Sequence, residues 1–237
     1  MTETYYVGAY WGPREDSLDQ CADRALRWFS RLREIDAAFA TWFELGSSRR
    51  QALSRPVEPD RQTITELLNR GRNRKDGGNR AVIPELGFRI DLWNGGDDEE
   101  SVKLSAACGA YTLTAPNNCI LRLPRSGSVA DRFLRVSALW ELVSATIACW
   151  EPDHAVVTSR RISDLLDLPV EGVEVGWLTY VSPKHPFVAD PPSQAKVEPL
   201  GSGQLVVTTE ERFTAERPEH LEIARGIARC LGVFPTT

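Results

Sequence analysis

Acid–base catalysis near neutral pH depends on side chains that titrate in that range, and histidine does so without perturbation. The sequence contains three histidines, His154, His185 and His220. The first opens a predicted strand after Pro152-Asp153, the second lies in a Lys-His-Pro sequence, and the third falls in the first turn of the last predicted helix. None has a convincing local partner, so the sequence favours ordinary surface or half-buried roles for all three.

Motifs with a fixed catalytic spacing are missing from the sequence. No Gly-rich loop ends in Gly-Lys-Ser/Thr, no Gly-x-Gly-x-x-Gly follows a strand, and no Gly-x-Ser-x-Gly occurs. The five cysteines are widely spaced and form no Cys-x-x-Cys pair, which favours buried free thiols over a metal or redox site: Cys21, Cys108, Cys119, Cys149 and Cys230. We therefore predict a protein that is not an enzyme and uses neither a cofactor nor a metal ion.

Four consecutive carboxylates, Asp97, Asp98, Glu99 and Glu100, form the most informative surface feature of the sequence. They repel one another and lack the mixture of buried ligands that a hard metal ion takes, so they are expected to face solvent. Such a charge run is usually a solvated surface. The functional alternative is that it attracts a basic partner, which would speed association and make the rate fall with salt.

Composition excludes several classes of protein. The chain has 237 residues, a formal charge of −5 and 42% hydrophobic residues, which is typical of a soluble globular domain and not of a disordered, collagen-like or membrane-spanning chain. The acidic balance argues against direct nucleic-acid binding, and the basic stretch GRNRKDGGNR is better explained as an exposed loop than as a phosphate clamp. The N-terminal sequence lacks the features of a secretion signal, so we expect a cytoplasmic protein without membrane contact.

The N-terminal third predicts a strand followed by helices. Tyr5 to Tyr10 favours a strand, and Ser17 caps a helix whose apolar residues recur at three- and four-residue steps as far as Leu32. A short helical piece is expected to contain Phe39, Trp42 and Phe43 and to end before Gly46, and a further helix to run from about Asp60 to Arg70.

The centre of the chain changes to a period of two. Phe88, Ile90 and Leu92 alternate with polar residues and Trp93, Asn94-Gly95-Gly96 supplies a turn, and apolar residues then alternate through Leu104. A third strand around Ile120 to Leu123 completes an antiparallel meander. By alternation Trp93 either lies under a covering helix or is exposed beside the acidic run, where aromatic residues often anchor interfaces.

The C-terminal half predicts one long helix from Ser128 to Ile147, short strands, and a last helix that begins at Pro218. The Pro-rich segment from Pro183 to Pro199 is expected to be irregular. These elements together predict an α+β fold, in which helices pack on a mostly antiparallel sheet, and a single domain over residues 1–237.

Several sequence segments together resemble the immunity protein 52 family. They are YYVGAYWGPRE from Tyr5, LLNRGRNRKD from Leu67, ELGFRIDLWNG from Glu85, and CGAY followed by PNNCILRLP. The resemblance is clearest over residues 5–124. It implies a bacterial antitoxin, encoded beside a polymorphic toxin and associated with restriction-endonuclease-like nucleases that include type VI secretion effectors.

The resemblance implies binding without catalysis, and its partner would be a cognate nuclease toxin. We expect the partner-binding residues to be Asp97, Asp98, Glu99, Glu100 and Trp93, which would meet a cationic toxin surface and block DNA entry or toxin self-assembly. Two other classes stay open. One is a hydrolase or nucleotide-handling enzyme with a site assembled from distant residues, for which Glu85 with Asp91 and Asp153 with His154 are weak candidates. The other is a scaffold or adaptor domain.

Overall fold

The computed structural model describes residues 3–169 and 172–234. Its strands are β1 (Tyr5–Trp11), β2 (Trp42–Glu44), β3 (Pro56–Val57), β4 (Phe88–Trp93), β5 (Lys103–Cys108), β6 (Asn117–Arg122), β7 (His154–Ser159), β8 (Leu178–Val181), β9 (Lys196–Leu200) and β10 (Gly203–Val207). Its helices are α1 (Leu18–Ile35), α2 (Arg49–Leu53), α3 (Arg61–Arg70), α4 (Gly127–Phe133), α5 (Val136–Trp150), α6 (Arg160–Leu166) and α7 (Pro218–Cys230), with 3₁₀ turns η1 (Ala37–Phe39) and η2 (Pro84–Leu86).

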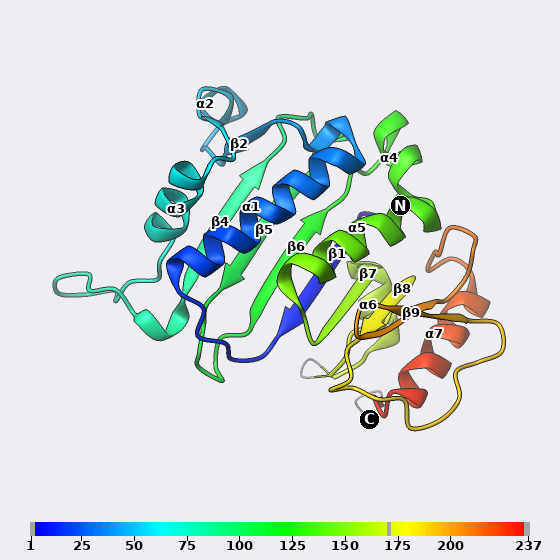
Figure 1. The fold of residues 1–237 in the computed structure, drawn as a ribbon. Coiled ribbons are helices and arrows are strands. Elements are labelled where there is room, and N and C mark those ends of the chain that lie inside the picture. The colour runs from blue at the N-terminus through cyan, green and yellow to red at the C-terminus, as the bar shows by residue number, and fades with distance from the viewer. Residues whose placement is uncertain (1–2, 170–171, 235–237) are drawn as a thin grey trace.

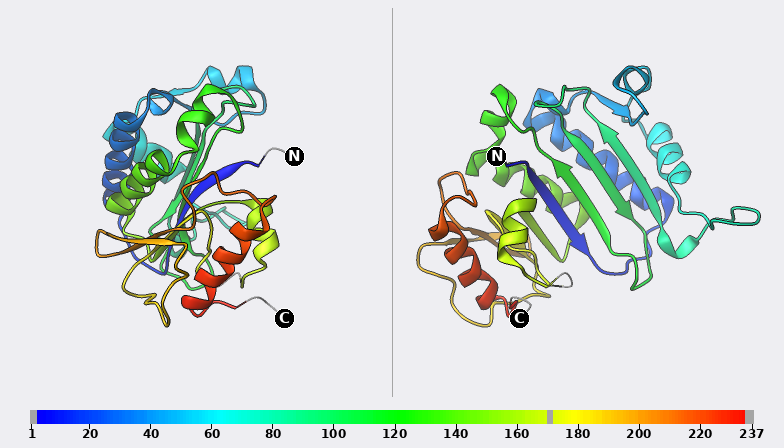
Figure 2. Two further views of the ribbon diagram at one scale, coloured as in Figure 1. Left: turned by 90° about the vertical axis from the view of Figure 1, so that its right-hand side faces the viewer. Right: turned by 180° about the vertical axis from the view of Figure 1, so that it is seen from behind.

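The described strands form one sheet in the order β3-β2-β4-β5-β6-β1-β7-β8-β10-β9, and every pairing in it is antiparallel. Helices α1, α3 and α5 lie side by side on one face of this sheet (Figure 1). Helices α6 and α7 lie on the other face, at the β7 and β8 end, and leave β4, β5, β6 and β1 without a helix there (Figure 2). The predicted α+β class is confirmed, and so is the meander β4-β5-β6.

One part of the core lies between the sheet and the α1–α5 layer, and another part includes buried side chains of α6 and α7 on the opposite face. Helix α1 begins where Ser17 forms a capping box with Gln20, as the sequence predicts. The indole of Trp28 donates a hydrogen bond of 3.1 Å to the Thr146 hydroxyl of α5 and meets Trp150 edge-on at 5.9 Å. Trp150 also stacks on Trp11 of β1 at 5.6 Å. These indoles fix α1 and α5 to the same face of the sheet.

The prediction of a helical piece around Trp42 is wrong in part. Only Ala37–Phe39 is helical, as a 3₁₀ turn, and Trp42–Glu44 is strand β2. Phe43 pairs with Trp93 of β4, and the Trp42 ring stacks on Phe39 at 6.3 Å. The free edge of β4 therefore imposes a strand on a segment whose apolar spacing is compatible with a helix.

The single helix predicted from Ser128 to Ile147 is also wrong. The segment forms α4 and α5, which meet at an angle of 76°, and α4 is preceded by Ser126 at the N-cap position. The break directs Phe133 onto Phe39 at 5.0 Å while α5 continues along α1. Within residues 3–169 and 172–234 no single helix is long and apolar enough to span a membrane, although this bent pair has the length and composition.

The Pro-rich segment is less irregular than the sequence predicts, because Lys196–Leu200 forms β9. This strand is at the edge of the sheet and pairs with β10 alone. An edge position tolerates Pro199, which has no N–H to donate to a further strand.

The turn before β4 requires glycine. Gly87 has φ 64° and ψ −140°, and a Cβ there would clash with the carbonyl oxygen of Cys108 and lie 2.6 Å from the Ala110 nitrogen. We expect Gly87→Ala to lower the free energy of unfolding by about 2 kcal/mol or more. Gly77→Ala is the control, since its Cβ would meet no atom within 4 Å. Urea denaturation of both variants tests this, and equal midpoints would refute it.

Candidate protein-interaction site

The acidic loop, defined as residues 97–100, joins β4 to β5 and has an ordered backbone. The Asp97 carboxylate accepts hydrogen bonds from the backbone N–H groups of Glu100 at 2.9 Å and Glu99 at 3.0 Å. These two bonds hold the pKa of Asp97 below its usual value. Asp97 is therefore an internal cap of the loop, although its side chain is exposed.

Asn94 closes the base of the same loop. Its carboxamide oxygen accepts hydrogen bonds from the Gly96 and Val102 N–H groups at 3.1 and 2.9 Å, and its amide nitrogen donates to the Ala38 carbonyl at 3.3 Å. Gly95 has φ 84°, as the turn sequence predicts. The sequence predicts the turn, but it does not indicate that the Asn94 side chain closes the loop.

The remaining carboxylates of the acidic loop differ in their surroundings. The Glu99 carbonyl accepts the N–H groups of Arg125 and Ser126, and its carboxylate accepts the Ser126 hydroxyl. Glu100 is half-buried next to Gly127 and interacts electrostatically with Arg132. Within residues 3–169 and 172–234, Asp98 has no hydrogen bond or ion pair. Asp98 is thus the carboxylate of this loop that is most available to a partner.

Trp93 is buried, with 7% of its surface exposed, so the alternative that placed it in solvent beside the acidic loop is wrong. Its ring lies 6.2 Å from that of Phe43 on the neighbouring strand. Phe43 in turn lies against Gly95 at the start of the turn. Trp93 therefore supports the acidic loop from below and presents little surface for direct contact.

The carboxylates of Asp153 and Asp91, from the two candidate catalytic pairs, have other partners. The Asp153 carboxylate accepts the Gly12 N–H at 3.0 Å and forms an ion pair with Lys184 at 2.7 Å, while Asp91 forms an ion pair with Arg89 at 2.7 Å. Burial, followed by the nearby His185, lowers the pKa of His154 to about 4. At neutral pH His154 is therefore uncharged, and its ring stacks on Tyr10 at 5.2 Å.

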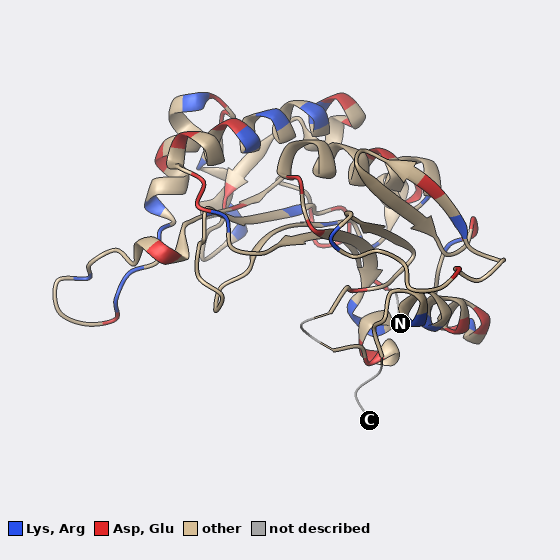
Figure 3. Ribbon diagram, turned by 60° about the horizontal axis from the view of Figure 1, so that its bottom comes forward, with Lys and Arg blue, Asp and Glu red and all other residues tan. Residues whose placement is uncertain are grey.

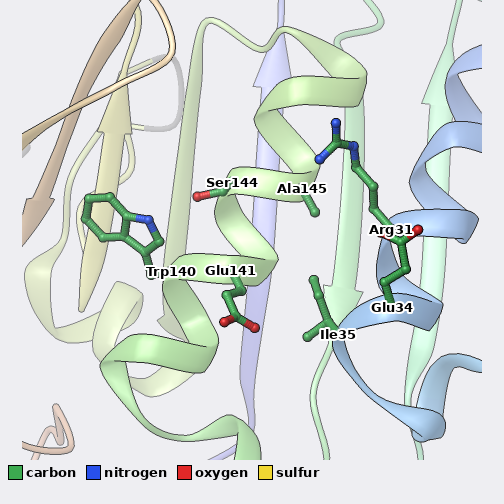
Figure 4. Close-up of a pocket in the computed structure, with 7 residues that line it drawn as sticks. All are labelled: Arg31, Glu34, Ile35, Trp140, Glu141, Ser144 and Ala145. Atoms are coloured by element: carbon green, nitrogen blue, oxygen red, sulfur yellow. The ribbon is translucent and has the colours of Figure 1, made fainter.

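A groove of about 380 Å³ lies between α1 and α5 (Figure 4). Its lining mixes charges of both signs with apolar side chains and contains no histidine: Arg31, Glu34, Ile35, Trp140, Glu141, Ser144 and Ala145. Across the described part of the chain, no group of three or more His, Cys, Asp or Glu residues is arranged to hold a metal ion. All five cysteines are buried free thiols, as predicted.

Comparison with known proteins identifies the family. The profile of the family described as Immunity protein 52 matches residues 3–233. The chain belongs to the immunity protein 52 family. No curated protein matches it. Its fold is similar to that of the Pseudomonas aeruginosa T6SS protein PA0821, at 11% identity and a TM-score of 0.53, over 97% of this chain and 75% of that one. At this identity the likeness shows the fold alone.

Membership of the immunity protein 52 family implies an immunity protein whose partner is a cognate toxin protein. The segments that carry the resemblance have structural roles here. Arg14 donates to the Trp150 carbonyl at 2.9 Å, pairs with Asp16 at 2.9 Å and lies over the Trp11 ring. Asn117 is fully buried and hydrogen-bonds both backbone groups of Ala110 and the carbonyl of Gly12. This immunity protein therefore uses these motifs to fix its loops.

The two aspartates of the acidic loop provide a matched test. In Asp97→Ala the backbone amides of Glu99 and Glu100 lose their acceptor, so their hydrogen exchange should accelerate, whereas Asp98→Ala should leave them unchanged. Because the pKa of Asp97 is lowered, protection should be complete above pH about 4 and be lost as the pH falls through the lowered value. NMR exchange rates measure both effects, and equal rates in the two variants would contradict the assignment.

Proposed function

We propose that this immunity protein neutralises a cognate nuclease toxin in the cytoplasm by forming a stoichiometric complex. The observation that carries the proposal is the family match over residues 3–233, nearly the whole chain. The carboxylates of Asp153 and Asp91, members of the candidate catalytic pairs, are engaged by Lys184 and Arg89, which is compatible with a structural role for both.

Charge supports a nuclease as the partner. A nuclease must present basic residues to the phosphate backbone of its substrate, and a protein with a formal charge of −5 can compete for that surface. Lysines, arginines and carboxylates are scattered along the helices and loops and are not gathered on one face (Figure 3). Electrostatic attraction to a basic groove would therefore depend on local clusters of carboxylates. The acidic loop, with four consecutive carboxylates, is the densest such cluster in the sequence.

The acidic loop is suited to orient the complex. Its backbone is held by Asp97, Asn94 and the contact of Glu99 with Ser126, so Asp98 is presented on an ordered support. Ordering before association reduces the entropy that binding must overcome. In this arrangement Asp98, Glu99 and Glu100 face the cationic toxin surface. Trp93 contributes indirectly, by packing against Phe43 at the base of the loop. The complex blocks DNA entry or toxin self-assembly.

Asp98 can be tested without disturbing the loop. We expect Asp98→Lys to slow association with the inactivated toxin encoded beside the gene by about threefold to tenfold at low salt, and the difference to shrink as salt rises. Neutralising all four carboxylates would also remove the Asp97 cap, so the single change is cleaner. The control is Asp190→Lys, an equal charge change at an exposed position before β9. Stopped-flow association rates measure the effect, and equal rates for both variants would exclude the acidic loop.

Co-expression tests the function as a whole. Growth should be rescued when this chain is produced together with the toxin encoded beside its gene, and the two proteins should co-purify. Failure of both results would reject the antitoxin function. Turnover of a phosphodiester substrate by the purified chain, lost on changing His154, would instead favour the enzyme alternative.

A further inference from the structure

The open face of the sheet, defined as the surface of β5, β6 and β1 that carries no helix, has a definite set of outward side chains (Figure 2). Burial alternates along β5 and β6, so Leu104 and Leu121 point to the core while Lys103 and Arg122 are exposed. Ile120, two residues before Arg122 on β6, points to the same side and is partly exposed. The sequence alternation of β5 and β6 could have predicted this face, but their pairing register could not be known.

Two cations face each other across this surface. Lys103 of β5 is the direct cross-strand partner of Arg122 of β6. Neither forms an ion pair with any residue that the structure describes, whereas Arg89 on the neighbouring strand pairs with Asp91 at 2.7 Å. Like charges at directly opposed positions of a sheet are destabilising. Because neither Lys103 nor Arg122 has a carboxylate partner among the described residues, the two are suited to bind a carboxylate of another molecule.

Two carboxylates near the cationic pair, Asp91 and Glu174, are already engaged by other groups. Tyr6 is the other cross-strand partner of Arg122 and donates its hydroxyl hydrogen bond to Glu174 at 2.7 Å. Glu174 also accepts the Ser163 hydroxyl at 2.7 Å. The cationic pair therefore stays without an internal partner, and the phenol ring of Tyr6 is fixed beside it.

The row of residues next to the cations runs through Asp91, Ser105, Ile120 and Gly8; Asp91 in it is paired with Arg89, and Ile120 is its apolar side chain. Ile120 is flanked by Ser105 on β5 and by Gly8 on β1. The Tyr10 ring lies over Gly8, because a Cβ there would be 2.6 Å from the Tyr10 hydroxyl. Fixed aromatic rings around a partly exposed aliphatic side chain, next to an arginine, have the composition of interface hot spots.

The charges of Lys103, Arg122 and the acidic loop distinguish between three possible partners for this surface: a second copy of the chain, a nucleic acid and another protein. A second copy of this chain, docked with its twofold axis passing between Lys103 and Arg122, would bring the cationic pair against itself. A nucleic acid would meet the acidic loop, whose last residue is three positions before Lys103, and a chain of net charge −5. A protein surface that combines carboxylates with neighbouring basic residues fits both features. A metal-dependent nuclease presents such a surface, since carboxylates hold its metal ions within a basic groove.

We propose that the open face of the sheet is the toxin-docking surface and that a toxin carboxylate binds between Lys103 and Arg122. This inference rests on the proposed function and specifies its contact surface. The acidic loop then lies on the basic rim of the toxin, and Ile120 receives an apolar side chain.

The test compares three variants against the inactivated toxin encoded beside the gene. Lys103→Gln/Arg122→Gln should raise the dissociation constant at least about tenfold. Its urea midpoint should stay equal or rise, because the repulsion between the two cations is removed. Arg27→Gln/Arg33→Gln is the control, since it makes the same charge change on α1, on the other face of the sheet. Ser105→Tyr adds bulk beside Ile120 and should also abolish tight binding.

Each outcome supports or overturns the inference. Loss of affinity in the cation variant and in Ser105→Tyr, with both folded and the control unaffected, supports it. Unchanged affinity in the cation variant overturns it and leaves the proposed function intact. No binding by the wild-type chain overturns both. Binding of a short DNA duplex that is lost in the cation variant would assign the pair to phosphate and overturn the docking proposal.

Discussion

The structure depends on the burial of one face of the sheet beneath α1 and α5. The stacking of Trp11 on Trp150, and the edge-on contact of Trp150 with Trp28, place both helices on the same side. Because an antiparallel sheet can bury one face and leave the other in water, the strands β4, β5, β6 and β1 then offer a flat surface held by the whole core. Groups on such strands are positioned more rigidly than groups on loops.

Buried amides extend this rigidity to the loops. Asn117 has no exposed surface and makes three hydrogen bonds to the backbone, which join the start of β6 to the segments after β1 and β5. Asn94 has the same role at the base of the acidic loop. A buried carboxamide with satisfied hydrogen bonds specifies one loop arrangement, because any other would leave its polar atoms unpaired. The family resemblance in these segments thus reflects loop architecture more directly than partner contact.

Local signals in the sequence were sufficient for elements that local interactions determine. Ser17 caps its helix as predicted, the helix expected from about Asp60 to Arg70 is present, and the alternation from Phe88 to Leu92 gives the strand expected. Elements determined by distant partners were not predictable in the same way. Trp42 joins a strand because β4 has a free edge, and the helix breaks after Phe133 because that ring packs on Phe39. Apolar spacing alone carries no information about either partner.

The same limit applies to the proposed interaction site. The acidic run was visible in sequence, but its division into a capping Asp97, an anchored Glu99 and a free Asp98 depends on backbone geometry. The opposition of Lys103 and Arg122 depends on register, which a shift of one residue would abolish. In the proposed complex, fixed charges of both signs at one end of the sheet would contribute to partner choice as well as to affinity, because a partner with the opposite order of charges is repelled both at the acidic loop and at the cationic pair.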